Sequence, residues 1–332
     1  MHPLLSAVAA GRLGVFTSQE ALRVGYRVED IRAELRTRRW SRLRKGIYIG
    51  ASDLAAADDR ERHLIDCVAV LLSLGPGPVL SHGSAARLHG LILPWRLPAE
   101  VRVTADDQWR RGRGYRVAQA RMSADEVEPW LQFSATSVPR TVVDCAREWS
   151  LTDGVIAIDA ALQKRKTTRS ALVRAVLGGT HRNGIAQAAR ALGLADGRAE
   201  SPLETRGRLA MLASGLPRPQ LQVEIHGPAG FIGRVDGWYE EAAVAVEFDG
   251  QIKYTDPQYV SSPAEALWKE KRREDELRAL GIRFVRVAHE DLGPPWPAVA
   301  ARIGGLVAAS YVGPRRWRAV PTEEPGGASE AA

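Results

Sequence analysis

The stretch Ala243-Val244-Ala245-Val246-Glu247-Phe248-Asp249-Gly250 decides the fold of the C-terminal part of the chain. Its short apolar run predicts a β-strand that is buried on both faces. Glu247 interrupts this run, and a buried carboxylate is unfavourable unless it has a partner or a function. We therefore interpret Glu247 as a functional carboxylate. Asp249 stands before Gly250 in a common tight-turn dipeptide, so a turn role for Asp249 stays open.

The sequence on either side of this strand predicts an α/β domain over residues 199–312. Ser201-Pro202-Leu203-Glu204 has the cap, proline and acid of a helix start. Alternation and turn residues predict a hairpin, and helical spacing returns further on. The other elements that we expect are strands at 221–225, 231–238 and 282–287 and a helix at 264–280. The expected order is helix, three strands, helix, strand, helix.

Acidic residues fall at the ends of two neighbouring strands of this domain. Asp236 lies near the end of one and Glu247 near the end of the next, so both carboxylates should reach one edge of the sheet. Glu204 can approach the same place from the preceding helix. Mg²⁺ prefers such oxygen ligands, so we predict that Asp236 and Glu247 hold Mg²⁺. Two alternatives stay open, because Glu204 can complete a capping box with Ser201, and Asp236 can form a turn before Gly237.

The same residues resemble the PD-(D/E)XK nuclease superfamily, and within it the domains similar to very-short-patch-repair endonucleases. The resemblance rests on Glu204, Val235-Asp236, Glu247-Phe248-Asp249-Gly250, the segment 269–275 and Arg286. It implies metal-dependent hydrolysis of DNA phosphodiester bonds, with Glu204 and Asp249 supporting the metal directly or through water.

One position departs from the usual motif of this superfamily. The superfamily has Lys two residues after the second acid, where this sequence has Asp249. Lys253 is our first substitute for orienting or activating the nucleophile, and Lys271 is the second. Lys271, Arg273 and Arg286 are expected to hold phosphate. The run from Lys269 to Arg278 alternatively forms a solvated helix face, because its charges mix in sign.

The first fifty residues predict a winged helix-turn-helix. Thr17-Ser18-Gln19-Glu20 is a capping-box pattern, and a second helix follows around Ile31. Strands at 40–43 and 47–49 then form a hairpin that turns at Lys45-Gly46. The residues that we expect to bind double-stranded DNA here are Arg32, Arg36, Arg38, Arg39, Arg42, Arg44 and Lys45. These cations alternatively form only a soluble surface.

The N-terminal half, to about residue 195, resembles the AbiEi-type antitoxins of bacterial type IV toxin-antitoxin systems. Residues 81–90 and 139–144 carry this resemblance together with the helices and hairpin before them. In that family the winged helix binds DNA and represses its own operon. The resemblance implies a DNA partner, together with a cognate toxin or defence protein.

Composition agrees with a folded protein that meets nucleic acid. The 332 residues carry a formal net charge of +7, mostly from arginine, although a GC-rich genome also raises arginine content. Cys67 and Cys145 have no metal-ligand or disulfide-framework spacing, which fits a reducing cytoplasm. The sequence contains no apolar stretch long enough to cross a bilayer, so no membrane partner is expected.

Our overall prediction is a multi-domain α/β protein of the bacterial cytoplasm. The expected parts are a winged helix (1–50), a mixed α/β middle domain (51–198), a nuclease-like α/β domain (199–312) and a disordered tail (313–332). The predicted function is Mg²⁺-dependent DNA endonuclease activity, in defence, toxin-antitoxin or repair. The alternative is a non-catalytic regulator of antitoxin type that keeps a degenerate nuclease fold.

Overall fold

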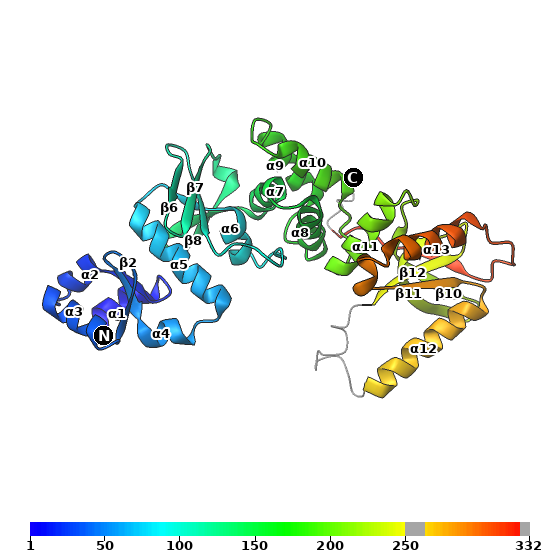
Figure 1. Ribbon diagram of the computed structural model, residues 1–332, viewed down its shortest axis with the longest axis horizontal. Coiled ribbons are helices and arrows are strands. Elements are labelled where there is room, and N and C mark those ends of the chain that lie inside the picture. The colour runs from blue at the N-terminus through cyan, green and yellow to red at the C-terminus, as the bar shows by residue number, and fades with distance from the viewer. Residues whose placement is uncertain (250–262, 326–332) are drawn as a thin grey trace. The chain divides into compact units, whose positions relative to one another are not determined.

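The computed structural model describes residues 1–249 and 263–325, with side chains undescribed at 263–267 and 269. These residues form a mixed α/β structure, as the sequence predicts, and their strands assemble into three sheets. The chain divides into two compact units, which are described separately (Figure 1). Unit 1 holds residues 1–157 and 170–189, and unit 2 holds residues 158–169 and 190–332. The predicted boundaries at residues 50 and 198 stay predictions about independently folding domains.

Unit 1 begins with a small sheet framed by helices. In chain order its elements are α1 (Pro3–Ala10), β1 (Val15–Thr17), α2 (Ser18–Arg23), α3 (Val28–Arg36), β2 (Trp40–Arg44) and β3 (Ile47–Gly50). The strands pair antiparallel in the order β1-β3-β2. The predicted capping box of Thr17 and Glu20 starts α2. The aromatic side chains of Phe16, Trp40 and Tyr48 pack together as the core of this N-terminal module, residues 1–50.

A larger sheet fills the rest of unit 1, in the order β6-β7-β5-β4-β9-β8. Its strands are β4 (Val79–Leu80), β5 (Val101–Ala105), β6 (Arg110–Gly112), β7 (Tyr115–Gln119), β8 (Val127–Trp130) and β9 (Phe133–Thr136). The helices are α4 (Ala51–Ala56), α5 (Asp59–Leu74), α6 (His82–Leu88), α7 (Val138–Glu148), α8 (Leu151–Gln163), α9 (Arg169–Gly178) and α10 (Ile185–Leu194). Helices α8, α9 and α10 each continue across the limits of the unit.

Helix α5 joins the two sheets of unit 1 because both of its faces are buried. Ile65 and Val68 pack against the small sheet, whereas Val70 and Leu71 pack against the larger one. The helix lies between the two sheets in Figure 1. The N-terminal module therefore shares its core with the middle of the chain.

Unit 2 has the predicted order of helix, three strands, helix, strand and helix. The elements are α11 (Pro202–Ala213), β10 (Gln220–Gly227), β11 (Gly230–Tyr239), β12 (Val244–Asp249), α12 (Pro263–Ala279), β13 (Arg283–Ala288), α13 (Trp296–Ala308) and β14 (Arg318–Pro321). The sheet order is β13-β12-β11-β10-β14, and within the described part of this sheet the β12–β13 pair is parallel and the other pairs are antiparallel. Helices α11 and α13 cover one face and α12 the other (Figure 1).

The prediction of a disordered tail is wrong for part of residues 313–325. Strand β14 pairs antiparallel with β10, and Trp317 packs edge-on against Trp238 at 5.0 Å between ring centroids. The carboxylate of Glu324 pairs with Arg169 and accepts a hydrogen bond from the Gly197 amide. The segment looks polar in sequence, but it gains a backbone ladder and one large apolar contact.

No helix within the described ranges combines the length and the apolar character needed to cross a membrane.

Candidate functional site

The carboxylates predicted to bind metal lie where β11 and β12 separate. On β12, Phe248 packs over Gly207 of α11, where an added Cβ would lie 1.9 Å from the ring. Because side chains alternate along a strand, the neighbouring Glu247 points to the opposite face, toward α12. Asp236 on β11 and Glu204 on α11 lie on the Phe248 side, as their hydrogen bonds show.

An amide group bridges Glu204 and Asp236. Gln222 Nε2 donates to Glu204 Oε2 at 3.0 Å and to Asp236 Oδ1 at 3.2 Å. Glu204 Oε2 also accepts the backbone N–H of Glu200 at 2.8 Å, while the Glu204 amide donates to Ser201 Oγ. Ser201 therefore caps the helix, but Glu204 does not complete a capping box, because its carboxylate accepts from the Glu200 amide and from Gln222 rather than from the Ser201 amide.

Asp236 ends the pairing between β11 and β12. Gly237 of β11 and Val246 of β12 are the last residues that pair between these two strands. Beyond them, Asp236 Oδ2 accepts the N–H of Phe248 at 2.9 Å, in place of a backbone carbonyl. This contact marks the point where the two strands stop pairing, and Asp236 does not form the turn before Gly237 that was the alternative.

Arg273 neutralises Glu247. Its Nη2 atom donates to Glu247 Oε1 at 2.8 Å and to Oε2 at 3.0 Å, and its Nη1 atom donates to the Arg234 carbonyl. Gly233 makes room for this side chain, because an added Cβ would lie 2.6 Å from Arg273 Cδ. Arg273 was expected to hold phosphate, and in this conformation it instead holds a carboxylate.

Burial and charge crowding raise the pKa values of two of these groups. Burial, and then the negative charge of Asp236, raise the pKa of Glu204 to about 7. Burial also raises the pKa of Glu247 above its usual range; Arg273 opposes this shift and Asp236 adds to it. Asp236 is therefore close enough to affect both glutamates, although Glu204 lies on its face of the sheet and Glu247 points to the face covered by α12.

The remaining predicted residues differ in their surroundings. Arg286 on β13 pairs with Glu270 at 2.9 Å and Glu274 at 2.7 Å, so its charge is directed to α12 rather than left for phosphate. Lys271 is exposed on α12. Asp249 is half-buried at the end of β12, beside Ala288 of β13. Lys253 lies outside the described residues.

The donor set suits Mg²⁺ in chemistry, although one conformational change is required. Carboxylate oxygens are the ligands that a hard cation prefers, and each oxygen keeps a lone pair when it accepts one hydrogen bond. Arg273 must leave Glu247, and Glu247 must turn toward Asp236, before both carboxylates can hold one ion. Within residues 1–249 and 263–325, no three His, Cys, Asp or Glu side chains are grouped to hold a metal.

Gln222 is a site residue that the sequence interpretation missed. It stands between Leu221 and Val223 in an alternating strand, a pattern that predicts a side chain on the solvent face. The structure buries it, and its backbone has a positive φ of 51°. Positive φ is uncommon for a residue with a side chain, and such positions concentrate at functional sites. The sequence offers no signal for this conformation.

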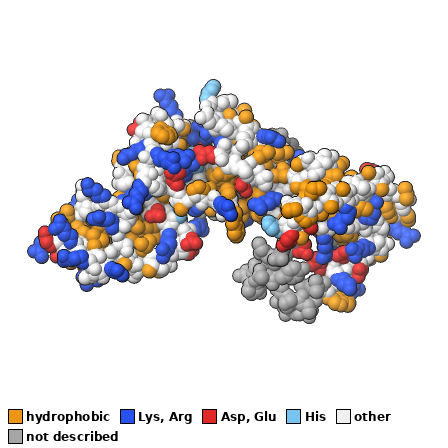
Figure 2. Space-filling view, in the orientation of Figure 1, with side chains coloured by type: hydrophobic (Ala, Val, Ile, Leu, Met, Phe, Trp, Pro, Cys, Tyr) orange, Lys and Arg blue, Asp and Glu red, His pale blue; other side chains and the backbone are white. Residues whose placement is uncertain are grey.

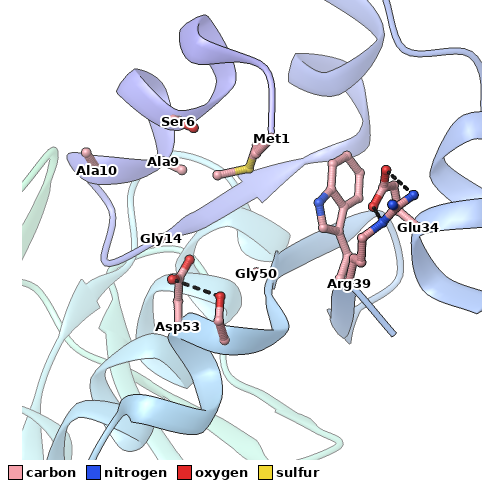
Figure 3. A pocket seen from close by; sticks show the side chains of 11 residues that line it. Met1, Ser6, Ala9, Ala10, Gly14, Glu34, Arg39, Gly50 and Asp53 are labelled. Atoms are coloured by element: carbon pink, nitrogen blue, oxygen red, sulfur yellow. Dashed lines mark hydrogen bonds and ion pairs between the residues drawn. The ribbon is translucent and has the colours of Figure 1, made fainter. Parts of the chain in front are cut away.

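In the N-terminal module, two of the predicted DNA-binding residues have internal partners. Arg39 Nε donates to Glu34 at 2.8 Å, and Figure 3 shows this pair at the side of a hollow of about 540 Å³. Arg44 Nη1 donates to the Arg113 carbonyl at 3.2 Å. The exposed members of the predicted set outside these two contacts are Arg32, Arg36, Arg38, Arg42 and Lys45, and Arg39 is exposed as well despite its pair with Glu34. Any contact with phosphate is therefore expected mainly from these exposed side chains.

Comparison with known proteins gives relatives without a described activity. No protein-family model matches the chain. The chain is 36% identical over 169 residues to uncharacterized protein MT2308 of Mycobacterium tuberculosis strain CDC 1551 / Oshkosh and, equally, to uncharacterized protein Rv2248 of strain ATCC 25618 / H37Rv. The match covers 51% of this chain and 60% of each relative.

Proposed function

We propose that the protein binds double-stranded DNA and hydrolyses its phosphodiester bonds with Mg²⁺. The observation that carries this proposal is the position of Asp236 where the β11–β12 pairing ends, beside Glu204 on one face of the sheet and close enough to Glu247 on the other face to raise the pKa of both glutamates. Like charges held together are unfavourable, and perturbed acids gathered in this way are typical of functional sites. The direct test is cleavage of plasmid DNA with Mg²⁺ and with EDTA.

Each residue of the cluster has a defined part in the proposal. Asp236 and Glu247 hold Mg²⁺, while Glu204 and Asp249 support it directly or through water. When bound, Mg²⁺ polarises the phosphate and lowers the pKa of a water molecule. Gln222 keeps Glu204 and Asp236 in place, since its two N–H groups reach both carboxylates. Lys253 keeps its proposed role of orienting the nucleophile.

Residues 1–50 form a winged helix in this proposal, fused to a nuclease-like domain in residues 199–312. Helix α3 would enter the major groove, and the β2–β3 hairpin would contact the phosphate backbone. A cognate toxin or defence protein, a cytoplasmic location and the likeness to AbiEi-type antitoxins belong to the same proposal.

Removing the exposed cations Arg36 and Arg42 should weaken duplex binding. Both lie on the proposed contact elements, at the end of α3 and on β2. The double substitution Arg36→Ala/Arg42→Ala removes two phosphate contacts, so the slope of log K against log salt should fall by about 1.8. Fluorescence anisotropy with a labelled duplex across a salt series measures both quantities.

Arg39→Ala is the matched control for this experiment. Its guanidinium is held by Glu34, so its removal should change the salt slope less than the loss of an exposed cation. If Arg36→Ala/Arg42→Ala keeps the wild-type affinity and slope, the N-terminal module does not bind DNA as proposed.

Arg273→Ala should strengthen Mg²⁺ binding, because Arg273 and the metal compete for Glu247. We expect a half-saturating Mg²⁺ concentration about tenfold lower, which corresponds to about 1.4 kcal/mol. The rise in melting temperature with Mg²⁺ measures binding without any need for activity. Arg272→Ala is the control, since Arg272 lies on the same helix and pairs with the exposed Glu276. Equal Mg²⁺ responses in both variants would contradict the competition.

A second candidate function is a non-catalytic regulator of antitoxin type with a degenerate nuclease fold. The observation in its favour is the contact between Arg273 and both oxygens of Glu247, which supplies the positive charge that a metal would otherwise bring. This candidate predicts DNA binding with no cleavage and no stabilisation by Mg²⁺.

A further inference from the structure

Strands β6 and β7 form a short hairpin at one edge of the larger sheet of unit 1. Strands β6 and β7 pair antiparallel from Arg110 to Gly112, with Gly112 opposite Tyr115. The Tyr115 ring lies over Gly112, where an added Cβ would lie 2.1 Å from a ring carbon. The turn contains Gly114 at a φ of 73°, a conformation that suits glycine. Side chains on this hairpin therefore project from a paired backbone.

The hairpin is strongly basic and exposed. Residues 110–116 contain four arginines and no acidic residue, and Arg110, Arg111 and Arg113 are exposed. Glu100 pairs only loosely with two of them, at 3.9 Å to Arg111 and 3.4 Å to Arg116. One carboxylate offsets only one of the four arginine charges, so the hairpin keeps a net positive charge. Figure 2 shows Lys and Arg side chains over this part of unit 1 and over the N-terminal module.

Arg44 connects the hairpin to the proposed DNA-binding module. It donates to the Arg113 carbonyl, and its Cζ atom lies 5.2 Å from the centre of the Tyr115 ring. The Cζ atom of Arg110 lies 5.9 Å from the same centre. Two guanidinium groups therefore share one aromatic ring. Their mutual repulsion would be relieved by an anion, and arginine is well suited to phosphate.

An exposed indole stands beside these arginines. Trp109 precedes Arg110 and is 68% exposed. A large aromatic side chain left in solvent gains nothing from folding, whereas contact with a sugar–phosphate chain would cover it. Exposed aromatic and arginine side chains together favour nucleic acid over a neutral protein surface.

We propose that the β6–β7 hairpin is a second DNA-contacting surface, which binds backbone phosphates of the same duplex that the N-terminal module holds. The inference rests on the proposed DNA binding and extends it to residues outside the winged helix. Arg110 and Arg111 supply the phosphate contacts, and Trp109 adds apolar contact.

The test compares hairpin variants of the full chain on a labelled DNA duplex across a salt series. Arg110→Ala/Arg111→Ala should lower the salt slope by about 1.8 and weaken binding about tenfold at about 0.1 M salt. Trp109→Ala should weaken binding without changing the slope. Lys164→Ala/Arg190→Ala removes two exposed cations elsewhere and should leave both quantities unchanged. Melting curves verify that each variant is folded, which is expected because the substituted side chains are exposed.

The outcomes separate this inference from the proposed function. Wild-type binding with an unchanged slope in Arg110→Ala/Arg111→Ala would overturn the second surface but leave DNA binding by Arg36 and Arg42 intact. Failure of the wild type to bind any duplex would overturn the proposed function and this inference with it. Tighter binding to an RNA of equal length, weakened by the same substitutions, would overturn the assignment to DNA.

Discussion

Asp236→Asn and Glu247→Gln should each lower Mg²⁺-dependent DNA cleavage by about a hundredfold to a thousandfold. Each substitution removes one of the two carboxylates proposed to hold the metal, whose contribution to transition-state stabilisation is several kcal/mol. Every 1.36 kcal/mol corresponds to a factor of about ten in rate. Supercoiled plasmid, assayed at several Mg²⁺ concentrations, separates a loss of metal affinity from a loss of turnover.

DNA affinity should survive both substitutions, because each removes a negative charge that faces phosphate. Glu224→Gln is the matched control, since Glu224 is a carboxylate of the same sheet that lies beside His226. This control should cleave like the wild type. A wild type that binds DNA but cleaves no form of it, and gains no stability from Mg²⁺, would leave the regulator as the function.

The strand that carries Glu247 could be predicted because its signal is local. Residues 243–248 are nearly all apolar, so burial on both faces follows from composition alone, and an acid inside such a run is conspicuous. The parallel pairing of β12 with β13 then brings Glu247 beside Arg286, as expected for a strand that follows a crossover helix. In the N-terminal module, the capping box at Thr17 is equally local.

The partners of the carboxylates could not be predicted, because they depend on tertiary packing. Arg273 is twenty-six residues from Glu247, and only the packing of α12 on the sheet determines that they meet. Gln222 looks like an outward polar residue until its backbone is seen in a left-handed conformation. Strand β14 was missed for the same reason, since its stability comes from β10 and from Trp238.

The free energy of unfolding should fall as pH rises through the range in which Glu204 loses its proton. Its pKa is about 7 in the folded protein, against an ordinary value of 4.5. Between these values the folded state holds more protons than the unfolded state, so the contribution of Glu204 to stability is fully present below about pH 4.5 and is lost up to about pH 7. A difference of this size corresponds to roughly 3 kcal/mol.

Glu204→Gln should remove this pH-dependent contribution to the free energy of unfolding. The variant should therefore be more stable than the wild type at pH 8. The side-chain carbonyl of the introduced glutamine can still accept from the Glu200 amide and from Gln222, so the hydrogen bonds that Glu204 makes are retained. Denaturant unfolding at pH 5 and pH 8 measures the effect as a difference between the two proteins, in which contributions from other titrating groups cancel. Glu276→Gln controls for the removal of one exposed negative charge on α12.

Mg²⁺ should stabilise the wild type more at pH 8 than at pH 5, because the ionised carboxylates are its proposed ligands. If Glu204→Gln and the wild type lose the same stability between the two pH values, the charges of Glu204 and Asp236 do not oppose each other, and the proposed metal site has no electrostatic basis.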